Sequence, residues 1–149
     1  MNAALGWALC LLMLAGAAER TEWMNDYGEA LEAARRAQMP LLVVLDHPAR
    51  RAAHFDRVSL DDRPATDRLL GRYKLCRVDV ATPYGQAVAK AFRASEFPTT
   101  VIIDKTARVQ IFVRTGTLGT DDLRAALAKY QTGERQLIET RREPAACFT

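Results

Sequence analysis

Few side chains in this sequence of 149 residues could carry out chemistry, and its three cysteines are the first candidates. A thiol exchanges disulfides or attacks a substrate only as an accessible thiolate. Cys76 lies in the segment KLCRVDV, where a cysteine in a strand is usually a small buried hydrophobic residue. Cys147 lies in the C-terminal segment RREPAACFT, and nothing around it resembles a prepared site. The sequence does not decide whether these two cysteines form a disulfide. Such a bond requires Cα atoms within about 7 Å, and the path of the C-terminal segment is not set by the sequence.

The two histidines, His47 and His54, could in principle bind a metal ion together with Asp46 or Asp56. Seven residues apart, they would share one helical face but lie about 10 Å from each other, too far to bind one ion. Pro48 also places His47 ahead of any helix. We therefore expect no metal site. The sequence has no Gly-rich phosphate loop, nucleophile elbow or HExxH helix, so we expect no cofactor.

Composition and charge exclude several classes of protein. With 49% hydrophobic and 26% charged residues, the chain is neither disordered nor collagen-like nor a polytopic membrane protein. Its 149 residues allow one compact domain. The net charge of +3 is small, and the basic pairs Arg35-Arg36 and Arg141-Arg142 have no interleaved aromatic residues. A nucleic-acid partner is therefore not expected.

Hydrophobic periodicity predicts the elements of the first half of the chain. A first helix, with Thr21 as its N-cap and its end before Pro40, is predicted by one stripe of apolar residues: Trp23, Tyr27, Ala30, Leu31 and Ala34. The run Leu41–Leu45 is apolar throughout, without the alternation of apolar and polar residues seen in a half-exposed strand. This pattern is typical of a central strand covered by helices on both faces. The alanine- and arginine-rich segment 48–60 follows, with its apolar residues roughly on one helical face.

The second half continues the alternation. A short helix is predicted from Pro64 to the stop at Gly71, and a second strand over Leu75–Val80. Val101–Ile103 and Val109–Val113 are predicted to form an antiparallel hairpin. Between these strands, a helix opening at Thr82-Pro83 would bury a face made of Tyr84, Ala87, Val88, Ala91 and Phe92.

A last helix completes the pattern. Thr120 is its predicted N-cap, with Asp121 and Asp122 in the first turn, where the helix dipole favours acids. Its buried stripe is Leu123, Ala126, Leu127 and Tyr130. A parallel βαβ unit followed by a hairpin and a helix predicts an α/β fold, with a four-stranded mixed sheet flanked by helices on both faces.

Two stretches of the sequence resemble the thioredoxin family. WMNDYGEALEAARRAQMPLLVVL is similar to the opening of exported thioredoxin-like domains, with an aromatic helix, a proline and an apolar strand. YKLCRVDVATPYGQAVAKAFRASEFPTTVIIDKTARV resembles the second half of that fold, and Phe97-Pro98-Thr99 followed by VIID is its most specific part. The resemblance spans roughly Trp23 to Gln131. It implies a thioredoxin-like fold in which the peptide bond before Pro98 is cis and lies beside the site.

The catalytic residues of the family do not carry over. Redox-active members have Trp-Cys-x-x-Cys after the first core strand, because the reaction needs a low-pKa thiolate and a second thiol one turn away. An ungapped overlay from Pro40 puts Ala49 at the tryptophan, Arg50 and Ala53 at the two cysteines, and Val44 at the buried acid. This part of the sequence has no cysteine at all, so composition excludes dithiol exchange at the usual site.

Arg50 and Arg51 fall where the next helix of the fold is expected to begin. A helix N-terminus attracts anions, so the pair could bind an acidic group. Solvated arginines further into the helix explain the pattern equally simply.

The resemblance and the missing cysteines together favour a redox-inactive protein that binds a protein or peptide segment, or has a structural role. Backbone beside a cis proline can pair with an extended peptide, so Phe97, Pro98 and Thr99 are the expected peptide-binding groove. The alternative from another class is a thiol–disulfide protein that uses Cys76 or Cys147 singly. A third hypothesis is a structural module tethered to a membrane.

The N-terminal segment suggests export. Residues 1–18 contain no charge, with the apolar run ALCLLML followed by Ala-Gly-Ala-Ala, as in a secretory signal peptide cleaved near Ala18. An uncleaved membrane anchor is the competing interpretation, although about 18 residues is near the lower limit for spanning a bilayer. The expected organisation is a signal peptide at 1–18, a thioredoxin-like domain at 19–131 and a polar tail at 132–149. The protein would be periplasmic or secreted.

Overall fold

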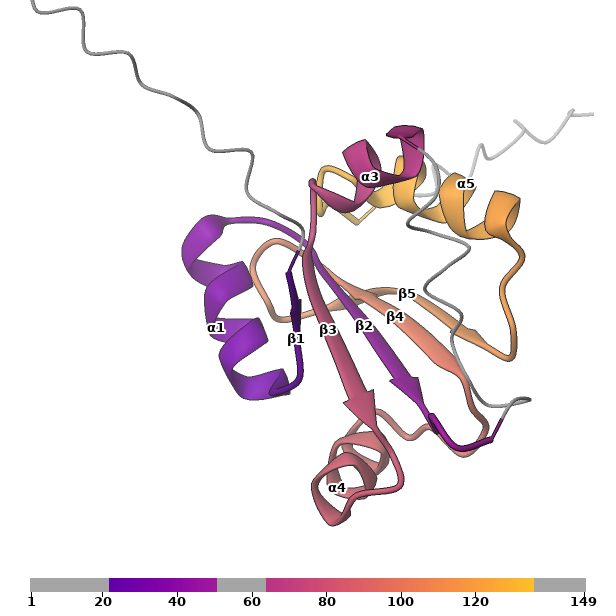
Figure 1. Ribbon diagram of the computed structural model, residues 1–149. Helices are drawn as coiled ribbons and strands as arrows, with labels where there is room; N and C mark the ends of the chain where they lie inside the picture. The colour runs from indigo at the N-terminus through magenta and orange to yellow at the C-terminus, as the bar shows by residue number, and fades with distance from the viewer. Residues whose placement is uncertain (1–21, 51–63, 136–149) are drawn as a thin grey trace, which may run out of the picture.

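A mixed five-stranded sheet lies at the centre of the molecule (Figure 1). The computed structural model describes residues 22–50 and 64–135. The strand order is β1-β3-β2-β4-β5; β1 and β2 run parallel to β3, whereas β4 runs antiparallel to β2 and to β5. The strands are β1 (Trp23–Met24), β2 (Leu41–Asp46), β3 (Lys74–Asp79), β4 (Thr99–Ile103) and β5 (Gln110–Thr115).

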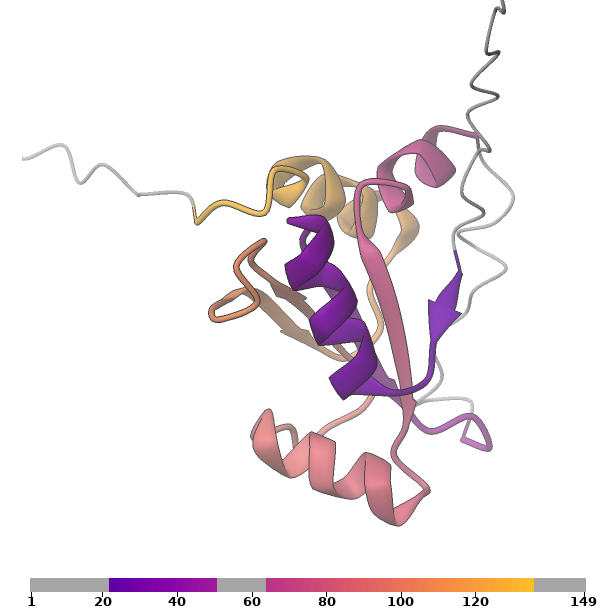
Figure 2. The ribbon, with the colours of Figure 1, turned by 90° about the vertical axis from the view of Figure 1, so that its left-hand side faces the viewer.

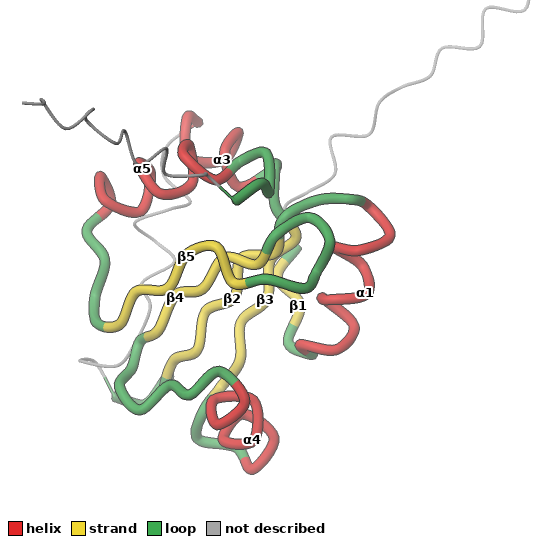
Figure 3. The backbone as a smooth tube through the Cα atoms, turned by 180° about the vertical axis from the view of Figure 1, so that it is seen from behind, coloured by secondary structure: helices red, strands yellow, loops and turns green. Residues whose placement is uncertain are grey.

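Helices cover both faces of this sheet (Figures 2 and 3). α1 (Tyr27–Ala37) and α4 (Pro83–Ala91) contribute to the hydrophobic cluster on one face. α3 (Pro64–Leu70) and α5 (Thr120–Tyr130) contribute to the cluster on the other. The predicted α/β architecture with a parallel βαβ unit and a C-terminal hairpin is therefore confirmed.

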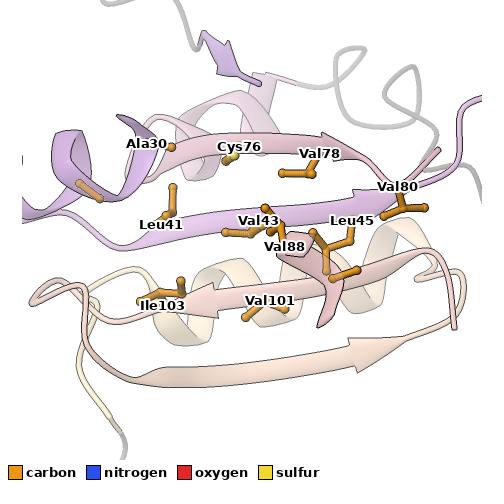
Figure 4. Packing of buried hydrophobic residues seen from close by; sticks show 12 residues of the cluster. Ala30, Leu41, Val43, Leu45, Cys76, Val78, Val80, Val88, Val101 and Ile103 are labelled. Carbon is orange, nitrogen blue, oxygen red and sulfur yellow. The ribbon is translucent and has the colours of Figure 1, made fainter. Parts of the chain in front are cut away.

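Strand β2 connects the two hydrophobic clusters. Leu41, Val43 and Leu45 pack against the side of α1 and α4, as Figure 4 shows, together with Val101 and Ile103 of β4. The intervening residues of β2, Leu42 and Val44, pack on the side of α3 and α5. All five residues of this run are 0% exposed. The absence of alternation in the sequence follows from this burial on both faces.

Two predictions for the N-terminal end are wrong: the start of the first helix, and the number of strands, which is five and not four. Trp23 and Met24 do not begin a helix; they form β1 and pair in parallel with Leu75 and Cys76 at the edge of β3. α1 begins later, and its N-cap is Asp26, whose side chain accepts a hydrogen bond from the Glu29 N–H at 2.8 Å. Trp23 and Met24 form a strand because β3 offers them an edge that β2 leaves unpaired. The local spacing of apolar residues does not reveal this edge. The predicted N-cap, Thr21, lies outside the described residues.

The start of α4 is confirmed and its buried face is corrected. Thr82 caps the helix by accepting a hydrogen bond from the Gly85 N–H at 2.9 Å. The buried residues are Gly85, Val88 and Ala89, whereas Tyr84 is 45% exposed. Ala87 and Ala91, predicted to be buried, are exposed, and Phe92 is half-buried.

Close approach of the backbone explains which face of α4 is buried. A Cβ at Gly85 would lie 1.9 Å from the Asp79 carbonyl oxygen. The helix therefore packs its glycine against the end of β3, which rotates the stripe of larger side chains away from the position that periodicity predicts.

The N-cap of α5 also differs from the prediction. Gly119 is the N-cap and Thr120 is the first helical residue; no side chain caps this helix. Asp121 and Asp122 do lie in its first turn. The predicted apolar stripe of α5 is confirmed. Its buried residues are Leu123, Ala126 and Leu127, and Tyr130 is half-buried.

Several predicted segments fall outside the described residues. These are the signal segment 1–18, most of the helical segment 48–60 and the tail beyond Arg135. Within the described ranges, none of the helices combines the length and apolarity needed to cross a membrane.

Asp104 holds the turn between β4 and β5. Its side chain accepts hydrogen bonds from the N–H groups of Arg108 and Val109, both at 2.8 Å, and from the Thr106 hydroxyl. Its backbone carbonyl accepts a further bond from the Ala107 N–H at 2.9 Å. Burial by itself would raise the pKa of the Asp104 carboxyl, but these hydrogen bonds outweigh burial and lower the pKa below its usual value.

We expect Asp104→Asn to destabilise the fold by about 1–2 kcal/mol at pH 7, because an amide offers one oxygen to donors that now share two. The folded-state pKa lies below the unfolded-state value, so the carboxylate stabilises the fold above about pH 4. This contribution is lost as the pH falls through the folded-state pKa. Urea titrations at a series of pH values should show the two stabilities converging in acid, and a constant gap would contradict this role.

Candidate functional site

One edge of the sheet gathers the segments that flank the candidate site. β2 and β3 run in parallel, so Asp46 and Asp79 end side by side, and the antiparallel β4 begins there with Thr99 opposite Leu45. The segment 47–50 leaves the sheet at this edge (Figure 1). Ligands of α/β proteins bind outside the carboxyl ends of parallel strands, so this edge is the candidate site.

The predicted cis peptide bond is present between Phe97 and Pro98. Pro98 and Thr99 are buried, and their polar groups are used within the protein. The Pro98 carbonyl accepts a hydrogen bond from the Gly116 N–H at 2.8 Å. The Thr99 hydroxyl donates to the Glu96 carbonyl at 2.5 Å. These two residues therefore shape the groove and have little surface of their own to offer a ligand.

Phe97 differs from its two neighbours. It is half-buried and precedes β4, outside the sheet ladder. In the described part of the chain, no group bonds to its backbone N–H or its carbonyl. An extended ligand can pair with a backbone donor and acceptor that the described residues leave unused.

Phe97 also lines a pocket of about 420 Å³ between the C-terminal part of α4 and the end of β3. The other residues of this pocket are Val80, Gln86, Ala89, Lys90, Arg93, Ala94 and Ser95. We call it the Phe97 pocket.

Some of the positions that the sequence overlay assigns to the family's redox residues lie in the described part of the chain. Arg50 is exposed, and its N–H donates to the His47 carbonyl at 3.0 Å. Val44, at the position of the family's buried acid, is 0% exposed and purely apolar. Ala53 and Arg51 lie outside the described residues. The described positions offer neither a nucleophile nor a base.

Sequence reasoning missed a buried ion pair at this edge. Asp46 is 0% exposed, and Arg77 of β3 binds both of its carboxylate oxygens. The Arg77 Nε donates to Oδ1 at 3.1 Å and Nη2 donates to Oδ2 at 2.6 Å. The available signal was an acid at the end of the apolar run of β2 and a basic residue, Arg77, between the apolar residues of β3. Because both oxygens accept hydrogen bonds from a guanidinium, this carboxylate is held as an ion-pair partner.

A second pocket of about 420 Å³ adjoins the ion pair. Tyr84 lines it from α4, and its hydroxyl accepts a hydrogen bond from the Tyr27 N–H at 2.8 Å, which ties α4 to α1. The remaining lining residues are Asn25, Asp46, Pro48, Arg77, Asp79 and Thr82.

Cys76 lies away from this edge. It is 0% exposed in the middle of β3, beside Ala30 of α1 (Figure 4). Burial, with a smaller contribution from the Asp26 carboxylate, raises the pKa of its thiol to about 12. The thiol is therefore protonated at neutral pH and packs as a hydrophobic side chain.

The other candidates for chemistry gain no support. Cys147 and His54 lie outside the described residues, so the disulfide and the paired histidines stay untested. His47 is half-buried at the end of β2. Among the described residues, no group of three or more histidine, cysteine or acidic side chains could hold a metal ion.

The ion pair generates a prediction about stability. Arg77→Met should destabilise the fold by about 3 kcal/mol, because it leaves the Asp46 carboxylate buried without its charged partner. The double variant Asp46→Leu/Arg77→Met should cost less than Arg77→Met alone, because it removes both charges. Urea unfolding measures both values. Arg36→Met, at an exposed position of α1, is the matched control and should change stability by less than about 0.5 kcal/mol. Equal losses in the single and double variants would contradict this account.

Comparisons by sequence find no match: no family model fits the chain and no curated protein is similar to it. Comparisons by structure find thioredoxins. The chain is similar to a thioredoxin from Thermus thermophilus (21% identity, TM-score 0.62), with 74% of this chain and 86% of that chain covered. It is also similar to thioredoxin O2 from Arabidopsis thaliana in the oxidized state (14% identity, TM-score 0.55; 74% and 95% covered). Thioredoxin NaTrxh from Nicotiana alata matches at 12% identity and a TM-score of 0.53, with 74% and 94% covered.

At 12–21% identity, these likenesses concern the fold. The chain therefore has a thioredoxin-like α/β fold.

Proposed function

We propose that this chain is a redox-inactive thioredoxin-like protein that binds an extended segment of another polypeptide at Phe97. The observation that carries the proposal is the backbone of Phe97. Its N–H and carbonyl have no partner in the described residues, and the residue stands directly before a cis proline at the candidate edge.

Pairing of backbone with backbone supports this mode of binding. An extended ligand segment would donate one N–H to the Phe97 carbonyl and accept one bond from the Phe97 N–H, as an added strand does at a sheet edge. The Gly116–Pro98 hydrogen bond fixes the residue that follows, so the site is formed before a ligand arrives. The Phe97 pocket then lies ready for a side chain of that segment.

Loss of redox activity is the second part of the proposal. The sequence lacks the two cysteines of the family site, and the thiol of Cys76 is buried with a pKa of about 12. A carboxylate does lie buried beside the family acid position, but Arg77 binds it. We also propose, from the apolar N-terminal segment, that the protein is exported.

We expect the full chain to give no acceleration of insulin reduction by dithiothreitol, because no described thiol is accessible. A variant with Cys10, Cys76 and Cys147 all replaced by serine is the control, and the two proteins should give the same background rate. Turnover by the wild type that disappears in the variant would overturn redox inactivity and assign the chemistry to a single cysteine.

Peptide binding can be tested without altering the protein. A phage-displayed library of 12-residue peptides is selected against the full chain, and the enriched peptides are synthesised with one backbone N-methyl group at each position in turn. N-methylation removes one donor, so affinity should fall at least about tenfold at the position that pairs with Phe97. Amide shifts in ¹H–¹⁵N spectra should change at Phe97 and Gly116 first.

Two outcomes would count against peptide binding at this edge. One is a library without enriched peptides. The other is a set of peptides whose affinity is unaffected by N-methylation and whose binding shifts amides of α5, on the opposite face of the sheet, in place of Phe97.

A further inference from the structure

We infer that the segment bound at Phe97 is acidic: it places an apolar side chain in the Phe97 pocket and a neighbouring Asp or Glu carboxylate on Lys90 and Arg93. This inference rests on the proposed function and specifies its ligand. It arises from the chemistry of the pocket, whose apolar residues lie next to two cations.

The lining of the Phe97 pocket divides into three kinds of residue. Four are apolar, two are neutral and polar, and two are basic, and none is acidic; the apolar ones are Val80, Ala89, Ala94 and Phe97. Its volume of about 420 Å³ is at the small end of ligand pockets and leaves ample room for an apolar side chain of a bound segment. An apolar side chain with a charged neighbour therefore matches both parts of the lining.

The two cations, Lys90 and Arg93, are exposed. Among the described residues, neither has an acidic partner. Glu96 is the acid nearest in sequence, but it does not line the pocket; its carbonyl accepts the Thr99 hydroxyl bond. The pocket thus presents positive charge that no acid in the described part of the chain neutralises.

Arg93 occupies a position that favours another residue. It has a φ of 56°, in the left-handed region, where α4 ends. The Ala94 N–H donates back to the Ala89 carbonyl at 2.9 Å, and the Arg93 N–H donates to the Lys90 carbonyl at 3.0 Å. This hydrogen-bond pattern ends many helices and usually has glycine in the left-handed position. Arginine here costs stability and keeps a cation at the pocket.

A cation at a helix C-terminus also interacts favourably with the helix dipole, which gives both residues a second effect, on helix stability. The experiment must therefore separate helix stability from ligand binding. Arg93→Gly does so, because glycine adopts the left-handed conformation more readily than arginine. This variant should keep or raise the Tm while it loses the charge.

The test starts from the peptides enriched by the library. They are synthesised with amidated C-termini, so that only side chains supply carboxylates, and are measured by fluorescence polarisation. We expect enrichment of an apolar residue next to Asp or Glu. Changing that acid to its amide should weaken binding about tenfold or more, and the affinity of the acidic peptide should fall with added salt.

A second set of measurements uses variants of the protein in place of variants of the peptide. Arg93→Gly and Lys90→Gln should each weaken the acidic peptide several-fold and leave its amide version unchanged. Arg36→Gln is the matched control: it removes an exposed cation on α1 near the start of β2, at the end of the sheet opposite the candidate site. That control should leave both affinities unchanged.

The outcomes separate this inference from the proposed function. Peptides that depend on pairing with Phe97 but show no preference for acids, or that bind Arg93→Gly and Lys90→Gln normally, would overturn the acidic ligand and leave the proposed function standing. Peptides that lose binding when amidated and regain it when synthesised with a free C-terminal carboxylate would also overturn it. A library without enriched peptides would overturn both.

Discussion

Complete burial of strand β2 is the constraint on which the rest of the structure depends. Five consecutive residues without solvent exposure need a strand on each side and a layer of helices on each face. β3 and β4 supply the neighbouring strands, and α1, α4, α3 and α5 supply the layers. The pairings of β2 then bring the end of β3 and the start of β4 to one edge of the sheet.

In the proposed function, that edge of the sheet binds a polypeptide and does not exchange disulfides. The position of the first family cysteine is an exposed arginine, and that of the buried acid is Val44. Two residues beyond Val44, Asp46 is bound on both oxygens by Arg77, so the buried charge here joins two strands. The peptide bond before Pro98 is cis, and the Phe97 backbone beside it has no partner among the described residues. In the proposed function, this backbone is the part of the site that pairs with a polypeptide.

The end of α4 adds positive charge to this region of the molecule. Lys90 and Arg93 place two cations beside the apolar residues that Phe97 shares with the helix. Arg93 holds a backbone conformation that glycine would adopt at lower free energy. A side chain kept at a cost to stability is best explained by what it contacts, and the proposed acidic segment is such a contact.

The sequence by itself determined the elements that a run or a regular spacing of apolar residues marks. The apolar run of β2, the stripe of α5 and the start of α4 at Thr82 were predictable, because each depends on neighbours within a few residues. The cis bond before Pro98 was implied by the resemblance of its segment to the thioredoxin family. Only the tertiary structure decided that Trp23 and Met24 form an edge strand, that Gly85 sets the buried face of α4, and that Asp46 meets Arg77. These features depend on segments brought together from up to 52 positions apart, as Trp23 and Leu75 are, and local periodicity carries no information about such a meeting.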